Sequence, residues 1–141
     1  MQFHPDEPFD HNLGQRAVWE KLKLALAGLD GHAYYRFPVF QDGGFYRYEI
    51  DVLLALRDHG VFALEVKGCE IRNIASIAGN AWTMVDWYTP TEAPGAQVDA
   101  QAFALRGLLA TRPELVGVRV HPRVVLPFVA RSDWVDRGFD L

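Results

Sequence analysis

Residues 46–67 of the chain read YRYEIDVLLALRDHGVFALEVK, two apolar segments separated by a polar turn. Aromatic and aliphatic residues dominate both segments, and such residues fit the pleated, half-buried surface of a β-sheet. We therefore predict strands over 46–56 and 61–67, joined as an antiparallel hairpin by a turn at 57–60. The alternation of the first strand places two sets of side chains on opposite faces: Tyr48, Ile50, Val52 and Leu54 on one, Arg47, Glu49 and Asp51 on the other.

The register of this hairpin decides whether its acidic side chains can meet. Directly opposed residues share a face, so a two-residue loop would put Asp51 and Glu65 on opposite faces of the sheet. A three-residue loop at 58–60 places Asp51 opposite Lys67 and diagonal to Glu65. It also puts Gly60 where such loops favour a left-handed residue. The sequence favours this second loop, which gathers two carboxylates and an amine on one face.

Two carboxylates beside an ammonium group suit a hard divalent cation such as Mg²⁺. The ion polarises a phosphoryl oxygen and lowers the pKa of a bound water from 15.7 toward about 7–9, which supplies hydroxide near neutral pH. The amine of Lys67 would hold that water or balance charge on the phosphate. The alternative is a structural ion-pair cluster. Buried ion pairs cost several kcal/mol per ion in desolvation, which favours the functional interpretation.

The rest of the chain alternates between helical and extended patterns. A helix is predicted to start after the N-cap Asn12 and to run to about 26–29, and a second helix is predicted over 96–110. The first dozen residues are expected to form a loose arm, and the tail at 131–141 carries no helix signal. Strands are predicted over 34–40, 71–77, 82–88 and within 116–129.

Composition restricts the class of protein. A chain of 141 residues favours one domain, and with 50% hydrophobic and 23% charged residues it is neither disordered nor collagen-like. Apolar runs reach about five residues, whereas a membrane-spanning helix needs roughly 18 or more, so no membrane association is expected. The acidic N-terminus does not resemble a secretion signal, and Cys69 is the only cysteine, so a cytoplasmic location is expected.

The two strand segments resemble the NERD domain, the nuclease-related domain family of the PD-(D/E)xK nuclease superfamily. The superfamily pattern is an acid followed by Glu-x-Lys on the next strand, here EIDVLL at 49–54 and GVFALEVKG at 60–68. The likeness extends to the helix at 14–26, to Trp82 and to the Pro94-x-x-Gln97 entry into the second helix. It implies a restriction-endonuclease-like α/β fold with a central mixed sheet flanked by helices.

The resemblance also implies a role for each matching residue. Asp51 and Glu65 would bind Mg²⁺ or Mn²⁺ together with the backbone carbonyl of Val66, and Lys67 would be the catalytic amine. The family usually offers a glutamate just after a small residue in the first helix, and this chain has Gln15 there.

Gln15 could still bind a water that ligates the ion, but it lacks the charge that a second metal requires. Alternatively, it is the capping-box partner of Asn12 at the start of the helix. Glu20 is a weaker candidate, because it lies two residues after Val18 and is therefore expected to face solvent.

Three further polar residues are candidates for accessory roles. Glu49 shares the strand face of Asp51, although a salt bridge to Arg47 or Lys67 is the simpler role. The likeness places Gln97 near the site, where its amide could touch a phosphate or orient a water. Without the likeness, Gln97 and Gln101 would be the polar edge of an amphipathic helix.

These observations predict a metal-dependent phosphodiesterase acting on DNA, formed by one domain over 1–141 that is expected to be the N-terminal part of a longer protein. The resemblance implies a partner such as a helicase module in the same polypeptide. A net charge of −4 means that contact with DNA must rest on a local site or on another domain. Trp82, Trp87 and Tyr88 could stack on unpaired bases, although core packing is the commoner role.

Two alternatives stay open. The first is a catalytically inactive PD-(D/E)xK-fold module that binds nucleic acid or a protein, and the substitution at Gln15 motivates it. The second is a purely structural interaction domain, in which the acids and the lysine form an ion-pair network.

Overall fold

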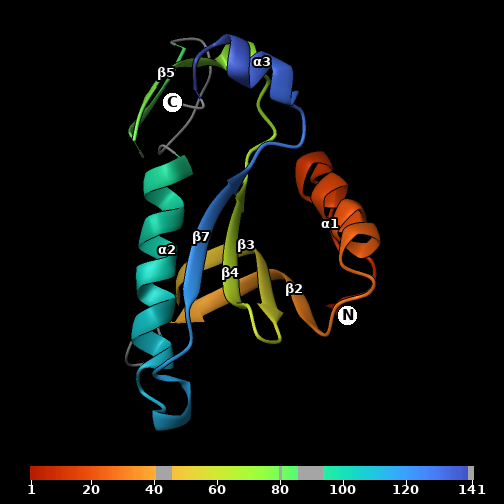
Figure 1. Cartoon of the computed structure of the whole chain (residues 1–141), viewed down its shortest axis with the longest axis vertical. Coiled ribbons are helices and arrows are strands. Elements are labelled where there is room, and N and C mark those ends of the chain that lie inside the picture. Colours follow the sequence, from red (N-terminus) through yellow and green to blue (C-terminus); the bar gives the residue numbers. More distant parts are fainter. Residues whose placement is uncertain (41–45, 80, 86–93, 140–141) are drawn as a thin grey trace.

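A mixed β-sheet with a helix on each face forms the centre of the domain (Figure 1). The computed structural model describes residues 1–40, 46–79, 81–85 and 94–139. Within them, five strands lie in the order β1-β2-β3-β4-β7, with β1 parallel to β2, β7 parallel to β4 and the other neighbours antiparallel. Their bounds are Gln2–His4 (β1), Gly31–Phe40 (β2), Tyr46–Leu56 (β3), Gly60–Val66 (β4) and Val120–Val125 (β7).

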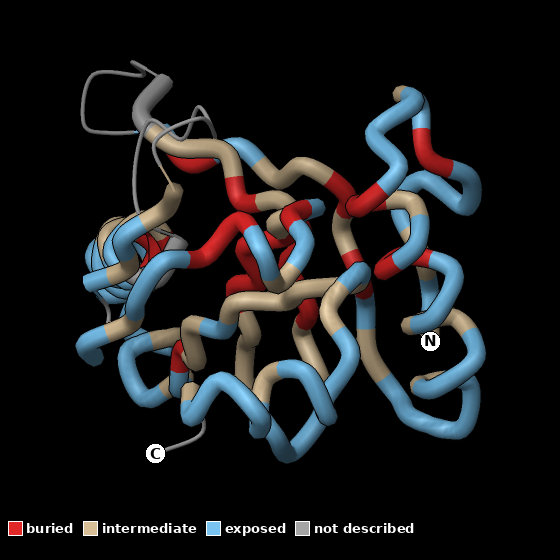
Figure 2. The backbone as a smooth tube through the Cα atoms, turned by 90° about the horizontal axis from the view of Figure 1, so that it is seen from above, coloured by how far each residue is buried: buried red, intermediate tan, exposed pale blue. Residues whose placement is uncertain are grey.

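The two faces of the sheet carry separate apolar cores, and Figure 2 shows the buried residues gathered in the middle of the molecule. Helix α1, Leu13–Ala25, packs Val18 and Trp19 against one face. Helix α2, Pro94–Leu109, packs Val98, Ala102 and Leu105 against the other. The α/β fold with a central mixed sheet flanked by helices is thus confirmed.

A smaller unit lies beyond the end of β4. It contains a 3-10 helix (η1, Ile71–Asn73), a hairpin of β5 (Ile74–Ala78) and β6 (Ala81–Met84), and the short helix α3 (Arg131–Asp136). The guanidinium of Arg137 joins α3 to the hairpin, because it donates to the carbonyl oxygen of Ile74 at 2.8 Å. A second 3-10 helix, η2 (Pro113–Leu115), lies between α2 and β7.

Several predicted boundaries differ from the structure. The first residues are not a loose arm, because Gln2–His4 pairs with β2. The tail is helical at Arg131–Asp136, where Trp134 packs against Trp82. The two tryptophans are 52 residues apart in the sequence, so no local pattern predicts this contact. The late strand is limited to Val120–Val125. The hairpin predicted from 71 begins at 74, and Trp87 and Tyr88 lie outside the described residues.

The alternation of side chains between the two cores is interrupted halfway along strand β3. Val52 packs in the core on the α1 side, whereas Ile50 packs in the core on the α2 side. Residues two apart in a regular strand share a face, so the alternation inverts at Asp51. Strand β2 inverts at the same level, where Arg36 adopts a left-handed φ of 55°. The prediction that residues 48, 50, 52 and 54 share one face is therefore wrong.

The loop of the β3–β4 hairpin lies one residue earlier than predicted. Leu56 pairs with Gly60, so the loop is 57–59. Asp58 takes the left-handed conformation inside it, with φ 66°, which aspartate tolerates better than most residues. The loop keeps its predicted length of three residues, so the two strands keep the predicted pairing of faces.

The shifted loop changes which residues meet across the hairpin. Continued from the pair Val52 and Leu64, this register aligns Asp51 with Glu65. The prediction that Asp51 lies opposite Lys67 is therefore wrong by two residues. The two acids nevertheless lie together, because Asp51 accepts a hydrogen bond from the N–H of Val66, the residue after Glu65, and the two carboxyls interact directly.

Alanine at Gly60 is expected to lower the free energy of unfolding by more than about 2 kcal/mol. A left-handed backbone alone costs an L-residue roughly 1–2 kcal/mol. In addition, a Cβ at Gly60, where φ is +95°, would lie 2.8 Å from the carbonyl oxygen of Arg119. Gly79 is the matched control, because its φ is +63° and a Cβ there meets nothing within 4 Å. Urea unfolding of both variants measures the difference, and equal losses would show that the backbone of Arg119 yields without cost.

Candidate functional site

Asp51 and Glu65 lie together where β3 and β4 separate. The pairs of the two strands end at Val52 and Leu64, and the Val66 N–H then donates to Oδ2 of Asp51 at 2.8 Å. The side chain of Asp51 thus replaces a strand carbonyl as the acceptor. Glu65 is only 5% exposed, and its carboxyl is within hydrogen-bond reach of the Asp51 carboxyl.

The two acids are held in surroundings that disfavour their charge. Burial raises the pKa of Glu65 from an ordinary 4.5 to about 8, and the nearby charge of Asp51 adds to this shift. Burial also raises the pKa of Asp51, despite the hydrogen bond from Val66. The positive charge of Lys67 lowers both pKa values without offsetting these causes. The pair is therefore short of positive charge at neutral pH.

This imbalance makes the stability of the metal-free domain depend on pH. The native state holds the proton of Glu65 more tightly than the unfolded chain does, so the free energy of unfolding is expected to fall between pH 4.5 and about 8. The loss is expected to be on the order of a few kcal/mol. Urea unfolding at several pH values in EDTA checks this. Glu65→Gln should flatten the decline, and an unchanged decline in that variant would assign it to other groups.

Lys67 follows β4 directly and is fixed by β7, because its N–H donates to the carbonyl oxygen of Val125 at 3.0 Å. Alternation along the strand places its side chain on the same face as that of Glu65. Among the described residues, no carboxylate lies within 4.0 Å of its ammonium group. The lysine is therefore near both acids without being locked in an ion pair, which argues against a purely structural cluster.

The carbonyl of Val66 is the third oxygen at this point. The N–H and the C=O of one strand residue point toward the same neighbouring strand. Since the N–H of Val66 reaches Asp51, its carbonyl points to the same side. The carbonyl is therefore on the side of the strand that faces Asp51, and its role as a ligand stays a prediction.

Gln101 of α2 contacts Glu65 from the helix side. Its side chain is 3% exposed, and its Nε2 donates to Oε2 of Glu65 at 3.3 Å and to the carbonyl oxygen of Glu49 at 3.2 Å. Its Oε1 is buried and has no partner among the described residues. The family likeness emphasised Gln97, which is half-buried one turn earlier, but Gln101 is the glutamine that reaches the acid.

Gln15 approaches from α1. A Cβ at Gly14 would lie 3.4 Å from the Cα of Gly68, so the start of the helix packs just beyond Lys67. The backbone N–H of Gln15 donates to the cap residue Asn12 at 2.9 Å, as the capping pattern predicts. The Gln15 side chain does not complete the capping box, because it is buried and its Oε1 has no partner among the described residues.

The remaining candidate acids are engaged elsewhere. Glu49 pairs with Arg36 at 2.6 Å, and no pair with Lys67, one of the two simpler alternatives, is found among the described residues. The side chain of Arg47, the other predicted partner, lies outside what the structure describes. The charge of Glu49 nevertheless helps to raise the pKa of Asp51, so it lies nearby. Glu20 is 58% exposed beside Lys23, on the solvent side as its helical position predicts.

The donors fit a cation that needs few protein ligands. In the part of the chain that the structure describes, no group of three or more His, Cys, Asp and Glu side chains could hold a metal ion. Asp51 and Glu65 supply two carboxylates, and the Gln101 side chain that contacts Glu65 has an amide oxygen without a partner among the described residues. Mg²⁺ is commonly held by one or two carboxylates plus waters and substrate phosphates, whereas Zn²⁺ prefers nitrogen and sulfur. The residues therefore fit Mg²⁺.

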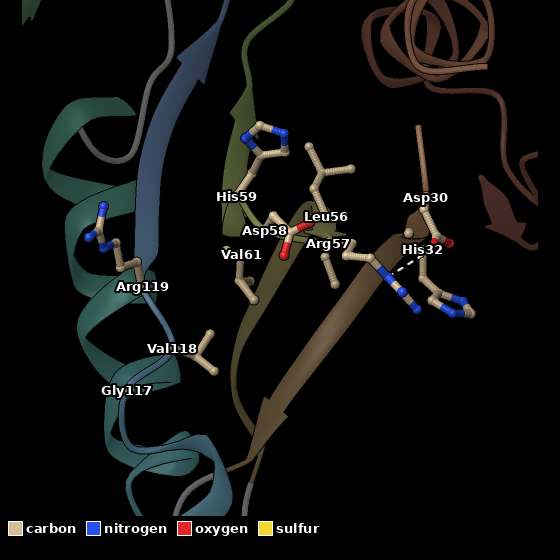
Figure 3. Close-up of a pocket in the computed structure, with 13 residues that line it drawn as sticks. Asp30, His32, Leu56, Arg57, Asp58, His59, Val61, Gly117, Val118 and Arg119 are labelled. Atoms are coloured by element: carbon tan, nitrogen blue, oxygen red, sulfur yellow. Dashed lines mark ion pairs between the residues drawn. The ribbon is translucent and has the colours of Figure 1, made fainter. Parts of the chain in front are cut away.

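A cavity of about 670 Å³ lies at the β3–β4 turn, away from these acids (Figure 3). Arg57, His59 and Arg119 are among its lining residues, and Arg57 forms an ion pair with Asp30 at 2.8 Å. Leu56, at the end of β3, is five residues from Asp51, or roughly 17 Å along the strand. The cavity therefore contributes nothing to the acid pair.

Comparison with known proteins identifies the family. No curated protein and no solved structure gives a significant match. None of the described helices is long and apolar enough to cross a membrane. Residues 10–127 match the family described as NERD, nuclease-related domain, and this segment contains Asp51, Glu65, Lys67 and Gln101. Because the match spans well over half of the 141 residues, the chain belongs to the NERD family of nuclease-related domains.

Proposed function

We propose that the domain is a Mg²⁺- or Mn²⁺-dependent nuclease that hydrolyses phosphodiester bonds of DNA. Membership of the NERD family supports a nuclease-related function. The observation that carries the finer proposal is the pair of carboxyls of Asp51 and Glu65, buried side by side next to Lys67, where burial and the neighbouring acidic charge raise their pKa values. A divalent cation would supply positive charge beside them.

Each side chain has a defined task in this proposal. Asp51, Glu65 and the Val66 carbonyl would hold the ion, which when bound polarises the phosphoryl oxygen and acidifies a water. Gln101 donates to Glu65 and so fixes its orientation as a ligand. Lys67 would orient the attacking water or balance the charge that develops on the phosphate.

Mg²⁺ is expected to stabilise the domain through this site. At 100 times the dissociation constant, a ligand that binds only the native state raises the free energy of unfolding by about 2.7 kcal/mol. Urea unfolding across a Mg²⁺ titration measures this increase, and Asp51→Asn should abolish it. Glu20→Gln is the matched control, because it removes an exposed acid on α1. If Mg²⁺ raises the free energy of unfolding of Asp51→Asn as much as that of the unsubstituted protein, Asp51 does not bind the metal.

The alternative function is a catalytically inactive module that binds nucleic acid or a protein. Gln15 favours it, since the family usually has a glutamate at that position. Nicking of supercoiled and single-stranded DNA in Mn²⁺ separates the two functions. Mg²⁺-dependent stabilisation without cleavage of either DNA would support the inactive module and overturn the nuclease. A helicase module in the same polypeptide stays a prediction of the family resemblance.

A further inference from the structure

A second pocket, of about 300 Å³, lies between β6, β7 and α3. Its polar and aromatic lining comes from Trp82, Arg131 and Trp134, and apolar residues of β7 and 126–130 complete it. Trp134 and Arg131 lie outside the 10–127 segment that matches the NERD family. The family assignment therefore does not account for this pocket.

The two indoles form a wedge. Their ring centroids are 5.7 Å apart and their planes are inclined by 46°, so neither ring covers the face of the other. Phe139 supports Trp134 edge-on from 5.1 Å, with an angle of 66° between the rings. Both indoles are half-buried, which fixes the rings while leaving aromatic surface exposed. A flat aromatic ligand fits such a wedge better than a branched aliphatic one.

Arg131 brings a positive charge to the lining of the pocket. Arg131 is exposed, and no carboxylate of the described residues lies within 4.0 Å of its guanidinium. Its charge is therefore available to a ligand. Guanidinium groups bind phosphate in a bidentate manner, so an aromatic ligand that carries a phosphate suits both parts of the pocket.

The pocket is one strand away from the acid pair. Val124 lines it and is aligned with Glu65 in the parallel β4–β7 pairing, so the two side chains share a face of the sheet. Neighbouring strands lie about 4.8 Å apart. A nucleotide in the pocket would therefore lie on the face of the sheet that carries Glu65.

We propose that the pocket of Trp82, Trp134 and Arg131 binds one unpaired base of single-stranded DNA, with a neighbouring phosphate on Arg131. The proposal rests on the proposed nuclease function for its choice of DNA. In a duplex each base is stacked and paired, so the wedge selects unpaired DNA. Aromatic stacking tolerates every base, so no sequence preference follows.

The test uses two short single-stranded oligonucleotides, one wholly abasic and one with a single thymine at its centre. Binding to the full chain is measured by fluorescence anisotropy in EDTA, which prevents metal-dependent cleavage. Stacking of one base is expected to lower the dissociation constant about 5- to 150-fold for the unsubstituted protein. Trp134→Leu should bind both oligonucleotides equally, whereas Trp134→Phe should keep most of the difference.

Controls separate the pocket from general effects. Phe103→Leu removes an aromatic side chain that is 77% exposed on α2, and it should leave the effect of the thymine unchanged. Cooperative urea unfolding and Mg²⁺-dependent stabilisation of Trp134→Leu confirm that α3 and the acid pair stay folded. If the unsubstituted protein binds both oligonucleotides with the same dissociation constant, the proposal is wrong. The pocket would then suit a side chain of a protein partner. An equal effect in Trp134→Leu would also overturn the proposal.

The outcome is independent of cleavage. If the unsubstituted domain cleaves DNA but the thymine effect does not depend on Trp134, the pocket proposal fails and the nuclease stands. If it cleaves no DNA but the thymine effect depends on Trp134, the nuclease fails and the base pocket stands.

Discussion

Lys67→Met is expected to reduce DNA cleavage about 10²- to 10⁴-fold, the range lost when a transition-state charge donor or a proton-transfer group is removed. Methionine keeps an unbranched chain of similar length but has no charge and no N–H donor. Initial rates of nicking of supercoiled DNA in Mn²⁺ measure the loss. Mg²⁺-dependent stabilisation should persist, because Asp51 and Glu65 remain.

Two controls define what Lys67 contributes. Lys21→Met removes an exposed amine of α1 and should leave the rate within a few-fold. Lys67→Arg should not restore the rate, because a planar guanidinium cannot replace a compact ammonium at a fixed point. Cleavage by Lys67→Met at the unsubstituted rate would show that the activity belongs to a contaminant, or that Lys67 has no part in it.

The hairpin of the acid pair could be predicted because its signals are local. The extent of β3 follows from its apolar composition, and a three-residue loop fixes which faces the paired residues from Val52 to Leu64 share, whichever residues occupy the loop. The exact register was missed because Asp58 and Gly60 both adopt positive φ values, so either could have closed the turn. Side chains alternate between the two faces of a strand, so an error of two residues in the register leaves each paired side chain on the same face.

The long-range contacts of the site could not be predicted from the sequence. Arg36 is an arginine in a left-handed conformation within a strand, which intrinsic preference disfavours, and its ion pairs with Asp10 and Glu49 help to hold it there. Gln101, not Gln97, contacts Glu65 because its turn of α2 faces the end of β4. Which turn does so depends on how the helix packs on the sheet. Trp134 acquires its partners only through the folded chain.

Gln15→Glu is expected to lower the dissociation constant for Mg²⁺ at least about tenfold, because it adds a charged oxygen to a site with two carboxylates. The Oε1 of Gln15 is buried and has no hydrogen-bond partner among the residues that the structure describes, so it is a polar atom that a ligand could satisfy. A third buried carboxylate should also lower the stability of the metal-free domain, since like charges out of water repel one another. The same substitution thus makes the metal-free protein weaker and its response to Mg²⁺ larger.

Gln15→Leu separates this role from packing. Removing an unsatisfied buried amide should leave the metal-free stability unchanged or higher, because no hydrogen bond of the side-chain oxygen is lost. Mg²⁺ titrations followed by urea unfolding compare both variants with the unsubstituted protein. If Gln15→Glu binds Mg²⁺ no more tightly, the α1 position does not face the ion. In that case the glutamine at position 15 does not weaken the metal site, and the observation that motivates the inactive-module alternative no longer supports it.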